Sequence, residues 1–549
     1  MDPQELKQAI ARTMPLLTAA DFCDRNAREI GAQEALVDRR RRLTWSNVKQ
    51  LSDRLALRLL GLGLRRDAKV LVQLPNVAEL FLTRLACEKA GLRLVTVTPN
   101  FRRAELSPIV RFTKPEVAII PQEYRGFNYP ELLGSIRTPG LRYLLVEGEN
   151  VPPGALSMED MLSPSPGLED NSDRLRKTRY SILDVCQIAT TSGSTGTPKC
   201  VEVPLYTRLL TGWIHLRRFG VGHNDKLAAV TPIVTGTADA LVYNGACQAG
   251  ARVVLIDHFA PDETCAIMEA EKVTVIPLVP TMIARLMAFL SLSRCDLGAL
   301  RVLISHGSHL PHAQGVEFEK LLGCRIVQGY GSVDCGGISA TSWGDPPEVR
   351  LGTVGRPLDG NEIKIVDARG REVQPREVGR LLVRGLHTEA RFFNNPKLDA
   401  SRRRDSYFDL QELARLDGRG NVILMGREQD LIIRGGRNIF PADIEEPLSQ
   451  HPKVQEVSVI GVPDPEMGER VCAYVVCNKG QPLNLSEVTS FLEEKGLARF
   501  KWPERLRIVD SLPRVASGHK IDKRKLEREL KESLSFEQMP ADRTHNEEN

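Results

Sequence analysis

The fold class follows from residues 68–99, which read AKVLVQLPNVAELFLTRLACEKAGLRLVTVTP. Residues 68–75 form a short apolar run that is typical of a buried strand. Residues 76–91 carry apolar side chains at helical spacing and end at Gly91, a residue that suits a helix terminus. Residues 92–99 again have the pattern of a buried strand. This order predicts two parallel strands joined by a helix that packs on one face of their sheet.

The alternation continues along the chain, with further strands expected at 116–121, 141–147, 251–257, 272–280, 301–305 and 324–329. Strands without long helices between them are expected at 361–367, 379–385 and 421–426, which favours an antiparallel subdomain. After residue 430 a smaller α+β pattern begins. We therefore predict an α/β fold with a large N-terminal domain of parallel-rich αβ sheets plus a β subdomain, followed by a small, mobile α+β C-terminal domain.

Two segments are expected to lie outside the packed core. Residues 150–175 are rich in proline, serine and acidic side chains, which is typical of a loop or linker. The residues from about Leu530 to the end are polar and charged, so we expect them to fray.

The composition excludes several classes of protein. Hydrophobic residues make up 42% of the 549 residues and charged residues 26%, near the average for globular proteins, so collagen-like and mostly disordered chains are excluded. A net charge of +4 is too weak to favour nucleic acid or an anionic membrane as a partner. The basic runs Arg39–Arg42 and Arg402–Arg404 lack interleaved aromatic residues, so we interpret them as solvated turns. No run of 18 apolar residues occurs, and we expect no membrane span.

The expected location is cytoplasmic. The N-terminus carries Asp2 and Glu5 and lacks a basic region followed by a long apolar run, so it does not have the pattern of a secretory signal. The 11 cysteines are an odd number, are scattered and form no Cys-x-x-Cys pair. They are typical of reduced thiols that mostly fill the core.

The most informative segment for function is residues 190–199, TTSGSTGTPK, which follow the apolar run CQIA and so lie where a strand ends. Small residues let the backbone approach a ligand closely, and consecutive amide groups with threonine and serine hydroxyls can wrap a polyphosphate. The segment is not a Walker A loop, because Pro198 stands where that loop needs a glycine. A flexible linker is the alternative, but a linker would not follow a buried strand or place Pro198 and Lys199 after the glycines.

This segment closely resembles the phosphate-loop signature of the adenylate-forming superfamily, which comprises acyl-CoA and aryl-CoA synthetases, peptide-synthetase adenylation domains and luciferases. The resemblance extends from about residue 25 to residue 530. It implies that ATP is bound by the loop and that Thr191 is also catalytic. The implied ATP contacts in this loop are Thr191, Ser192, Gly193, Ser194, Thr195, Gly196 and Lys199.

Residues 329–334, GYGSVD, are similar to a second signature, which in the family reads Tyr-Gly-x-Thr-Glu. The resemblance implies that Tyr330 stacks near the adenine, and that Asp334 is catalytic and holds Mg²⁺ against the phosphates. Because aspartate is one methylene shorter than glutamate, a shifted ion or an intervening water would be needed. The alternative is that Asp334 is the solvent-facing acid of a turn. The other nucleotide contacts implied in this segment are Gly329, Gly331 and Ser332.

Residues 305–310, SHGSHL, occupy the place of the family's adenine-binding loop, which implies nucleotide contacts by His306, Gly307 and Ser308. Zinc binding by His306, His309 and His312 is a second interpretation. No carboxylate or cysteine accompanies these histidines at metal spacing, and Pro311 argues against a regular helix that would align them. We therefore favour the nucleotide loop.

The family's ribose-binding motif, Tyr-x-Thr-Gly-Asp-Leu, is altered in this sequence. Aligning LARLD, residues 413–417, puts Gln411 at the glycine and Glu412 at the aspartate that binds the ribose hydroxyls. A glutamate is still an acceptor suited to two hydroxyl donors. Asp409 is a competing candidate, and Glu412 as an ordinary exposed residue is the alternative. By resemblance Arg427 contacts the ribose or a phosphate, with a surface cation as the alternative.

The C-terminal signatures imply a two-domain enzyme. By resemblance, Asp430 is the hinge between a domain of residues 1–429, which binds the nucleotide and the acid, and a cap domain of residues 430–549. The turn at Gly435 and Gly436 is expected to face the thiol arm of CoA. Residues 512–520, LPRVASGHK, resemble the terminal signature whose lysine, Lys520 here, is catalytic and contacts the nucleotide. Without the resemblance, Lys520 is one cation in a basic run with Lys523, Arg524 and Lys525.

Two features of the sequence indicate which class of carboxylic acid is the substrate. Residues 73–91, 118–132 and 498–513 look closest to aryl-acid activating members, especially the dihydroxybenzoate-adenylating group. The family's Pro-x-x-His segment reads PIVTG at residues 232–236, so its histidine or aromatic wall is absent. We expect room for a cyclic, aromatic or otherwise bulky acid. The residues expected to line this pocket are Val234, Thr235, Gly236 and Gly331.

The function that follows from the resemblance is ATP-dependent conversion of a carboxylic acid to an acyl-adenylate with release of pyrophosphate, then transfer to a thiol, for which we expect CoA. The expected cofactors are ATP, Mg²⁺ and CoA, or the phosphopantetheine of an acyl carrier protein. Two alternatives stay open: a stand-alone adenylase that loads a carrier protein or releases the adenylate, and a nucleotide-binding protein that has lost catalysis. The expected partners are the acid and CoA or a carrier protein, without nucleic acid. The oligomeric state stays open, with a homodimer as one option.

Overall fold

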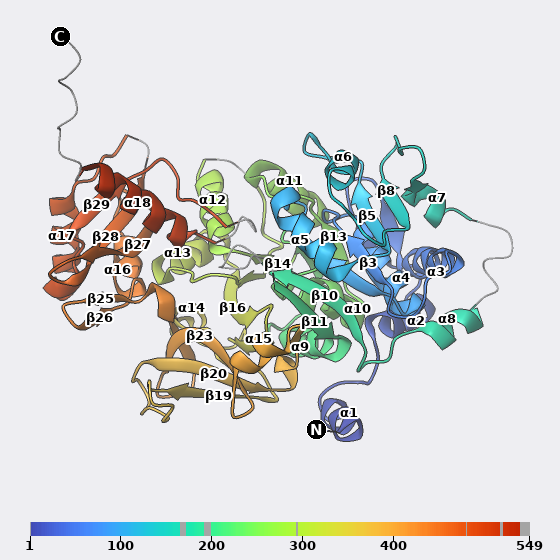
Figure 1. Cartoon of the computed structure of the whole chain (residues 1–549), viewed down its shortest axis with the longest axis horizontal. Helices are drawn as coiled ribbons and strands as arrows, with labels where there is room; N and C mark the ends of the chain where they lie inside the picture. Colours follow the sequence, from blue (N-terminus) through green and yellow to red (C-terminus); the bar gives the residue numbers. More distant parts are fainter. Residues whose placement is uncertain are drawn as a thin grey trace, which may run out of the picture. The chain divides into compact units, whose positions relative to one another are not determined.

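The computed structural model describes residues 2–164, 172–191, 199–292, 295–478, 480–515 and 520–537, and its elements are shown in Figure 1. The chain divides into two compact units. The first contains residues in the ranges Met1–Ile365, Leu382–Leu410 and Leu416–Ile423. The second contains residues in the ranges Val366–Leu381, Gln411–Arg415 and Leu424–Asn549. The predicted mixed α/β class with parallel-rich sheets is confirmed.

The first unit contains a nine-stranded sheet in the order β18-β17-β16-β15-β14-β12-β13-β1-β2. The six strands from β16 to β1 are parallel, and β2, β17 and β18 each pair antiparallel with a neighbour. The bounds are β1 Glu34–Val37, β2 Arg42–Thr44, β12 Lys226–Ala229, β13 Arg252–Leu255, β14 Val275–Leu278, β15 Val302–Ser305, β16 Arg325–Ser332, β17 Gly336–Ala340 and β18 Arg356–Pro357.

An eight-stranded sheet of the same unit has the order β21-β11-β10-β4-β3-β5-β8-β9. It contains the predicted strand–helix–strand unit: β3 and β4 are parallel, with Val70 opposite Leu94, and α4 (Ala78–Ala90) joins them. Gly91 ends α4 in the left-handed region, at φ +68°. The bounds are β3 Lys69–Val72, β4 Arg93–Thr96, β5 Val117–Pro121, β8 Tyr143–Glu147, β9 Leu156–Ser157, β10 Val185–Thr191, β11 Lys199–Pro204 and β21 Arg391–Phe392.

Three smaller sheets complete the strands of the described residues. One has the order β19-β20-β23-β22 with β24 paired to β23, another has the order β26-β25-β28-β27 with β29 paired to β28, and β6 pairs with β7. The bounds are β6 Glu123–Tyr124, β7 Phe127–Asn128, β19 Asn361–Val366, β20 Gly379–Gly385, β22 Arg403–Arg404, β23 Tyr407–Leu416, β24 Val422–Arg427, β25 Ile432–Arg434, β26 Arg437–Ile439, β27 Val454–Asp464, β28 Gly468–Cys477 and β29 Arg505–Ile508.

Helices connect most of these strands. The α-helices other than α4 are α1 Pro3–Ala11, α2 Ala19–Glu29, α3 Trp45–Gly61, α5 Arg103–Thr113, α6 Tyr129–Gly134, α7 Met158–Leu162, α8 Ser172–Thr178, α9 Leu205–Arg218, α10 Ala246–Ala249, α11 Pro261–Glu271, α12 Pro280–Leu290, α13 His312–Leu322, α14 Pro347–Gly352, α15 Pro396–Ser401, α16 Ala442–Leu448, α17 Leu485–Glu494 and α18 Lys523–Glu537. A π-helix, η1, spans Ala238–Gly245, and short 3₁₀ turns are η2 Leu386–Thr388, η3 Glu428–Asp430 and η4 Arg499–Lys501.

Two segments that were predicted to lie outside the packed core are in fact partly folded and buried, so these two predictions are wrong. Residues 150–175 are not simply a linker, because β9, α7 and part of α8 lie within them, and Met158 and Met161 of α7 are buried. The chain does not fray at Leu530, because α18 continues to Glu537. Leu526 and Leu530 of α18 are buried in the second unit, where they pack with Val462 of β27. Apolar residues at helical spacing thus outweigh the polar composition of both segments.

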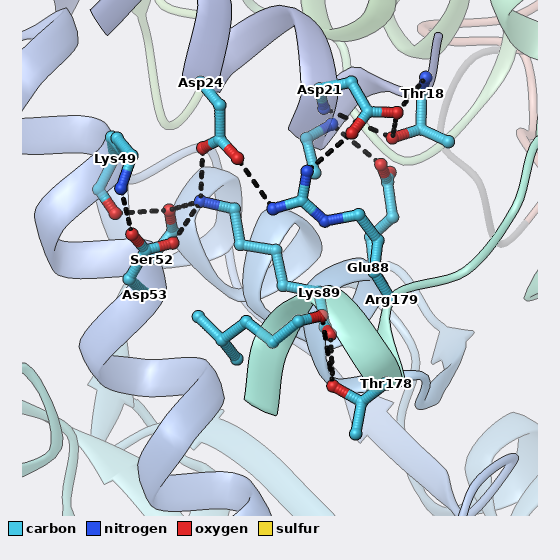
Figure 2. A network of polar contacts seen from close by, with 12 residues as sticks. Thr18, Asp21, Asp24, Lys49, Ser52, Asp53, Glu88, Lys89, Thr178 and Arg179 are labelled. Atoms are coloured by element: carbon cyan, nitrogen blue, oxygen red, sulfur yellow. Dashed lines mark hydrogen bonds and ion pairs between the residues drawn. The ribbon is translucent and has the colours of Figure 1, made fainter. Parts of the chain in front are cut away.

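A buried network of charges joins helices α2, α3 and α4 (Figure 2). The ammonium of Lys89 has no exposed surface and lies 3.1 Å from Asp24 and 2.5 Å from Asp53. Arg179 binds Asp24 at 2.6 Å from the other side. Burial alone would lower the pKa of Lys89, but the two carboxylates outweigh it and raise that pKa, so the lysine is charged in the folded protein. This network fixes α2, α3 and α4 to one another, and α4 in turn packs against β4.

All 11 cysteines are free thiols, most of them buried, as their scatter in the sequence predicts. Among the residues that the structure describes, every helix is too short or too polar to cross a lipid bilayer.

Candidate active site

The predicted phosphate loop lies between two paired strands. β10 ends at Thr191 and β11 begins at Lys199, and these two residues are opposite each other in an antiparallel pair. The hydroxyl of Thr190 donates to the carbonyl of Thr96 on the neighbouring strand at 2.8 Å, which anchors the end of β10. The predicted strand end is therefore present. Residues 192–198 fall outside the described ranges, and with them five of the predicted ATP contacts: Ser192, Gly193, Ser194, Thr195 and Gly196.

The structure brings together Lys199 and Asp334, two predicted site residues from different motifs. The ammonium of Lys199 lies 3.5 Å from the Asp334 carboxylate. Arg402, which follows α15, lies 3.7 Å from the same carboxylate oxygen and donates through Nε to the carbonyl of Asp409 at 3.0 Å. A carboxylate between two cations lies at the end of the phosphate loop, where polyphosphate charge could replace it as the partner of both cations.

Arg402 corrects one interpretation of the sequence. The run Arg402–Arg404 is not a solvated turn, because only 10% of the Arg402 side chain is exposed. Its guanidinium also lies 5.1 Å from the centre of the Phe408 ring. Three consecutive arginines give no local sign of which one is buried, so the sequence pattern could not single out Arg402.

The residues around Asp334 could hold Mg²⁺ only together with ligands from outside the protein. Within the described ranges no cluster of three or more His, Cys, Asp or Glu side chains could hold a metal ion. Mg²⁺ held by Asp334 would therefore take most of its ligands from phosphate oxygens and water, as it commonly does. The same result gives no support to zinc at His306, His309 and His312, and α13 begins at His312 directly after Pro311.

The two predicted adenine segments lie at one edge of the nine-stranded sheet. His306 directly follows β15 and Gly329 lies in β16 after its parallel pairing, with Ser305 opposite Gln328. The carboxyl ends of parallel strands form the usual ligand-binding edge of such a sheet. Gly307 has φ +86°, and Ser308 beside it is exposed. Tyr330 and Ser332 lie in the same strand as Gly329, so the sheet brings all of these residues to one edge.

Gly331 has a packing reason of its own. A Cβ at this position would lie 2.7 Å from the carbonyl oxygen of Gly336 on β17, so only glycine fits the close approach of the two strands. The glycine of the Tyr-Gly motif is thus explained by the sheet before any ligand is considered.

Residues 232–236, the segment predicted to line the pocket for the carboxylic acid (the acid segment), are hydrogen-bonded through their backbone by side chains from elsewhere in the chain. The sequence motifs did not reveal these side chains. Arg84 of α4 donates to the carbonyl of Ile233, and Asn76 accepts from the amide of Ile233 at 3.1 Å. Gln187 of β10 donates to the carbonyl of Val234 at 2.9 Å. Thr235 lies in the same turn, and its amide donates to Pro232. Gly236 has φ +57°, and a Cβ there would lie 4.0 Å from Nδ1 of His306.

A buried ion pair fixes Arg84. Its guanidinium lies 2.7 Å from Asp239 of η1 and 3.5 Å from the centre of the Tyr243 ring. Arg208 of α9 approaches Asp239 at 3.6 Å. Burial would lower the pKa of Arg84, and the charge of Asp239 outweighs it and raises that pKa. The pair joins α4, α9 and η1 beneath the acid segment.

The two candidates for the ribose ligand, Asp409 and Glu412, differ in burial and in their charged partners. Asp409 is buried and its carboxylate lies 3.2 Å from Arg404, so it already has a cationic partner. Glu412 is more exposed and its carboxylate lies 4.0 Å from Arg427, the other predicted contact, on the adjacent strand β24. Gln411 keeps φ +57°, a conformation in which the family has glycine. The backbone directly before Glu412, inside β23, is therefore left-handed although the residue is not glycine.

The remaining predicted residues lie in the second unit. Gly435 and Gly436, with φ +54° and +76°, form the two-residue turn between β25 and β26, which explains the glycine pair. Asp430 ends the 3₁₀ turn η3. Lys520 is exposed, and its carbonyl accepts from the amide of Val515 at 2.9 Å.

Comparison with known proteins gives the family. Residues 23–391 match the AMP-binding enzyme family, and residues 443–519 match the AMP-binding enzyme C-terminal domain. The chain therefore belongs to the AMP-binding enzymes, a family of adenylate-forming ligases, and the resemblance stated from the motifs is confirmed.

Several relatives match over nearly the whole chain. A 2-hydroxy-7-methoxy-5-methyl-1-naphthoate–CoA ligase of Streptomyces carzinostaticus is 32% identical over 91% of each chain. A 2,3-dihydroxybenzoate-AMP ligase of Bacillus subtilis is 29% identical over 94% of each chain. The crystal structure of an anthranilate CoA ligase in complex with anthranoyl-AMP matches with a TM-score of 0.85 and 25% identity, covering 96% of this chain and 99% of that one.

Proposed function

We propose that this protein uses ATP to convert an aromatic, or otherwise cyclic and bulky, carboxylic acid into an acyl-adenylate and then transfers the acyl group to the thiol of CoA. In the first step a carboxylate oxygen bonds to the α-phosphorus of ATP and pyrophosphate leaves. In the second step the thiol sulfur bonds to the acyl carbon and AMP leaves. The first step brings an anion against a polyanion, so positioned cations matter more than an acid or a base.

The observation that carries this proposal is the meeting of Lys199, Arg402 and Asp334 at the end of the β10–β11 loop. In the proposal the two cations face the phosphates beside Thr191 and the rest of the loop, and Asp334 would hold Mg²⁺, which when bound offsets phosphate charge. Tyr330 and the segment 306–308 face the adenine. Glu412 and Arg427 face the ribose, because Asp409 is already paired.

The second unit has two roles in the proposal. Lys520 lies between the acid carboxylate and the α-phosphate during adenylation, which lowers their repulsion. The turn at Gly435 and Gly436 faces the thiol arm in the second step. The change between the two roles is a rotation about Asp430, which separates a domain of residues 1–429 from one of residues 430–549.

The class of acid is supported by the relatives and by the small residues of the acid segment. The naphthoate and dihydroxybenzoate ligases named above act on acids with aromatic rings. In this chain Val234, Thr235 and Gly236 occupy the corresponding segment, and no aromatic or histidine side chain occurs in residues 232–236. We infer a ring-containing acid that contacts both this segment and Gly331.

A pyrophosphate-exchange panel tests the acid. Benzoates, naphthoates, cyclohexane carboxylates and fatty acids of several lengths are each incubated with the enzyme, ATP and labelled pyrophosphate. We expect exchange with aromatic or alicyclic acids and little with acetate or butyrate. Exchange with the short acids alone would contradict the proposal.

The acceptor has a second candidate, a carrier protein, which is favoured by the similarity to a ligase that is named for its AMP product. The enzyme is given ATP, an accepted acid and either free CoA or a phosphopantetheinylated aryl carrier protein, and the thioester is detected by mass spectrometry. Acyl-CoA at a rate near that of exchange supports CoA. Loading of the carrier without acyl-CoA supports the second candidate.

A further inference from the structure

His215 has an unusual position in α9. Only 4% of the residue is exposed, and its ring stacks on Phe219 with the ring centres 4.8 Å apart. Neither ring nitrogen has a hydrogen-bond partner among the residues that the structure describes. A buried imidazole without a partner loses the hydrogen bonds that it makes in water, so a polar group is expected to meet it in the working protein.

The edge of the His215 ring faces Gly329, in the predicted nucleotide motif. A Cβ built at Gly329 would lie 3.8 Å from Cε1 of His215, 3.9 Å from its Nε2 and 3.7 Å from the hydroxyl of Thr237. Thr237 directly follows Gly236 of the acid segment, and Gly329 precedes Tyr330. Because Gly329 has no side chain, the nearest polar groups at this position are the hydroxyl of Thr237 and the ring of His215.

A second buried histidine, His387, provides a comparison, because both of its ring nitrogens have hydrogen-bond partners in the protein. His387 is fully buried, and its Nδ1 lies 2.9 Å from the hydroxyl of Thr211, one turn before His215 on α9. Its Nε2 lies 3.1 Å from the carbonyl of Asp359. Both nitrogens of His387 are thus satisfied by the protein, whereas neither nitrogen of His215 has a hydrogen-bond partner among the described residues.

His215 is neutral when buried in this way. Burial lowers its pKa to about 3, with a further contribution from the positive charge on nearby Arg218. A neutral imidazole has one donor nitrogen and one acceptor nitrogen. It therefore suits a hydroxyl or an amine, which can both donate and accept, better than it suits a second carboxylate.

We propose that His215 is a specificity-determining residue that hydrogen-bonds a hydroxyl or amino substituent on the ring of the acid, reached past Gly329. The inference rests on the proposed function and narrows its substrate class to hydroxylated or aminated aromatic acids. A site built around a buried polar group rejects the analogue that lacks the matching substituent, because the group is then left unpaired.

The test compares ring-substituted and unsubstituted acids in His215→Leu. Pyrophosphate exchange is measured with benzoate, the three hydroxybenzoates, 2-aminobenzoate, 1-naphthoate and 2-hydroxy-1-naphthoate. We expect the wild type to prefer at least one hydroxy or amino acid over its parent, and His215→Leu to lower that ratio of kcat/KM by about 10-fold, the effect of one buried hydrogen bond. The KM for ATP should stay within about twofold, and His215→Gln, which keeps a donor and an acceptor, should restore most of the preference.

A second variant keeps the test decisive if His215→Leu does not fold. Gly329→Ala adds a methyl group that meets only ordinary van der Waals contacts, so it should fold, and it places that methyl between His215 and the ligand. It should lower the same ratio. A wild type without any preference, or a ratio within about twofold of wild type in both variants, would overturn the inference while leaving aryl-acid activation standing. Exchange with no aromatic acid at all would instead contradict the proposed function.

Discussion

At the scale of single residues, the basic run after the last motif contains cations of different kinds. Lys523 is bound to Glu445 at 2.7 Å and to the carbonyl of Val459, so it stabilises the second unit. Lys525 is exposed and lies 3.7 Å from Glu529, a helical pair of small energetic weight. Lys520 is exposed and precedes the helix that contains both, which suits a side chain that acts on a ligand.

We expect Lys520→Ala to lower acid-dependent pyrophosphate exchange by about 100-fold or more, the usual effect of removing one group that stabilises developing charge. The melting temperature should change little, because the interactions of an exposed side chain contribute little to stability. Lys525→Ala is the matched control and should retain exchange within about twofold. An unchanged exchange rate in Lys520→Ala would show that another residue has the catalytic role, or that the protein only binds the nucleotide.

Neutralising Glu412 and neutralising Asp409 are expected to affect different properties, ATP binding in the first case and thermal stability in the second. Glu412→Gln should raise the KM for ATP by roughly 10-fold, because hydrogen bonds to a charged acceptor are stronger than those to an amide. Asp409→Asn should lower the melting temperature and leave the KM for ATP unchanged, because its buried carboxylate pairs with Arg404. Steady-state kinetics and thermal unfolding of the two variants decide between them, and the reverse pattern would make Asp409 the ribose ligand.

At the scale of elements, the acid segment depends on the buried pair between α4 and η1. Asp239 has no exposed surface and faces both Arg84 and Arg208. Arg84 in turn holds the carbonyl of Ile233. Displacing Arg84 would therefore move residues 232–236. None of the predicted site residues lies in α4, α9 or η1, the helices that contain Arg84, Arg208 and Asp239.

We expect Asp239→Asn to reduce the free energy of unfolding by about 3 kcal/mol, because two arginines are left buried without their carboxylate. The KM for the acid should rise more than the KM for ATP. Urea unfolding and exchange kinetics measure the two effects. Glu389→Gln, which breaks an exposed pair with Arg391, is the control and should cost about 0.5 kcal/mol or less. Equal increases of both KM values would contradict the positioning role of the pair.

At the scale of the whole molecule, the buried histidines make stability depend on pH. Burial lowers the pKa of His215 to about 3 and of His387 to about 4, from an ordinary value of 6.5. As the pH falls below 6.5, the unfolded chain therefore binds protons that the folded protein does not. The contribution is fully present above pH 6.5 and is lost progressively at lower pH.

Between pH 7 and pH 5, each of these histidines should cost the folded protein roughly 2 kcal/mol. We expect His215→Leu to lose about 2 kcal/mol less than the wild type over this range, because it has one such histidine fewer. Urea unfolding at the two pH values measures the difference. His223→Leu, at an exposed histidine, should behave like the wild type. An identical pH dependence in His215→Leu and the wild type would show that His215 is protonated as easily when folded as when unfolded.

Sequence patterns predicted the elements where the signal is local. Strand and helix patterns in residues 68–99 are enough, because apolar periodicity and a terminal glycine act within a few residues. Composition misled at residues 150–175 and beyond Leu530, where a few apolar side chains at helical spacing determine the structure. The family could be predicted because its motifs are contiguous, and residues 190–199 with 329–334 were sufficient.

The family and the α/β class could be read from local sequence patterns, and the same patterns predict which segments approach the nucleotide. The pairings around the predicted site became visible only in the folded chain: Arg402 beside Asp334, Arg84 with Asp239 beneath residues 232–236, and His215 behind Gly329. The physical reason is that a buried charge or imidazole is defined by what packs against it. Those neighbours come from other strands and helices, whose meeting is fixed by the sheets and leaves no mark in the local pattern.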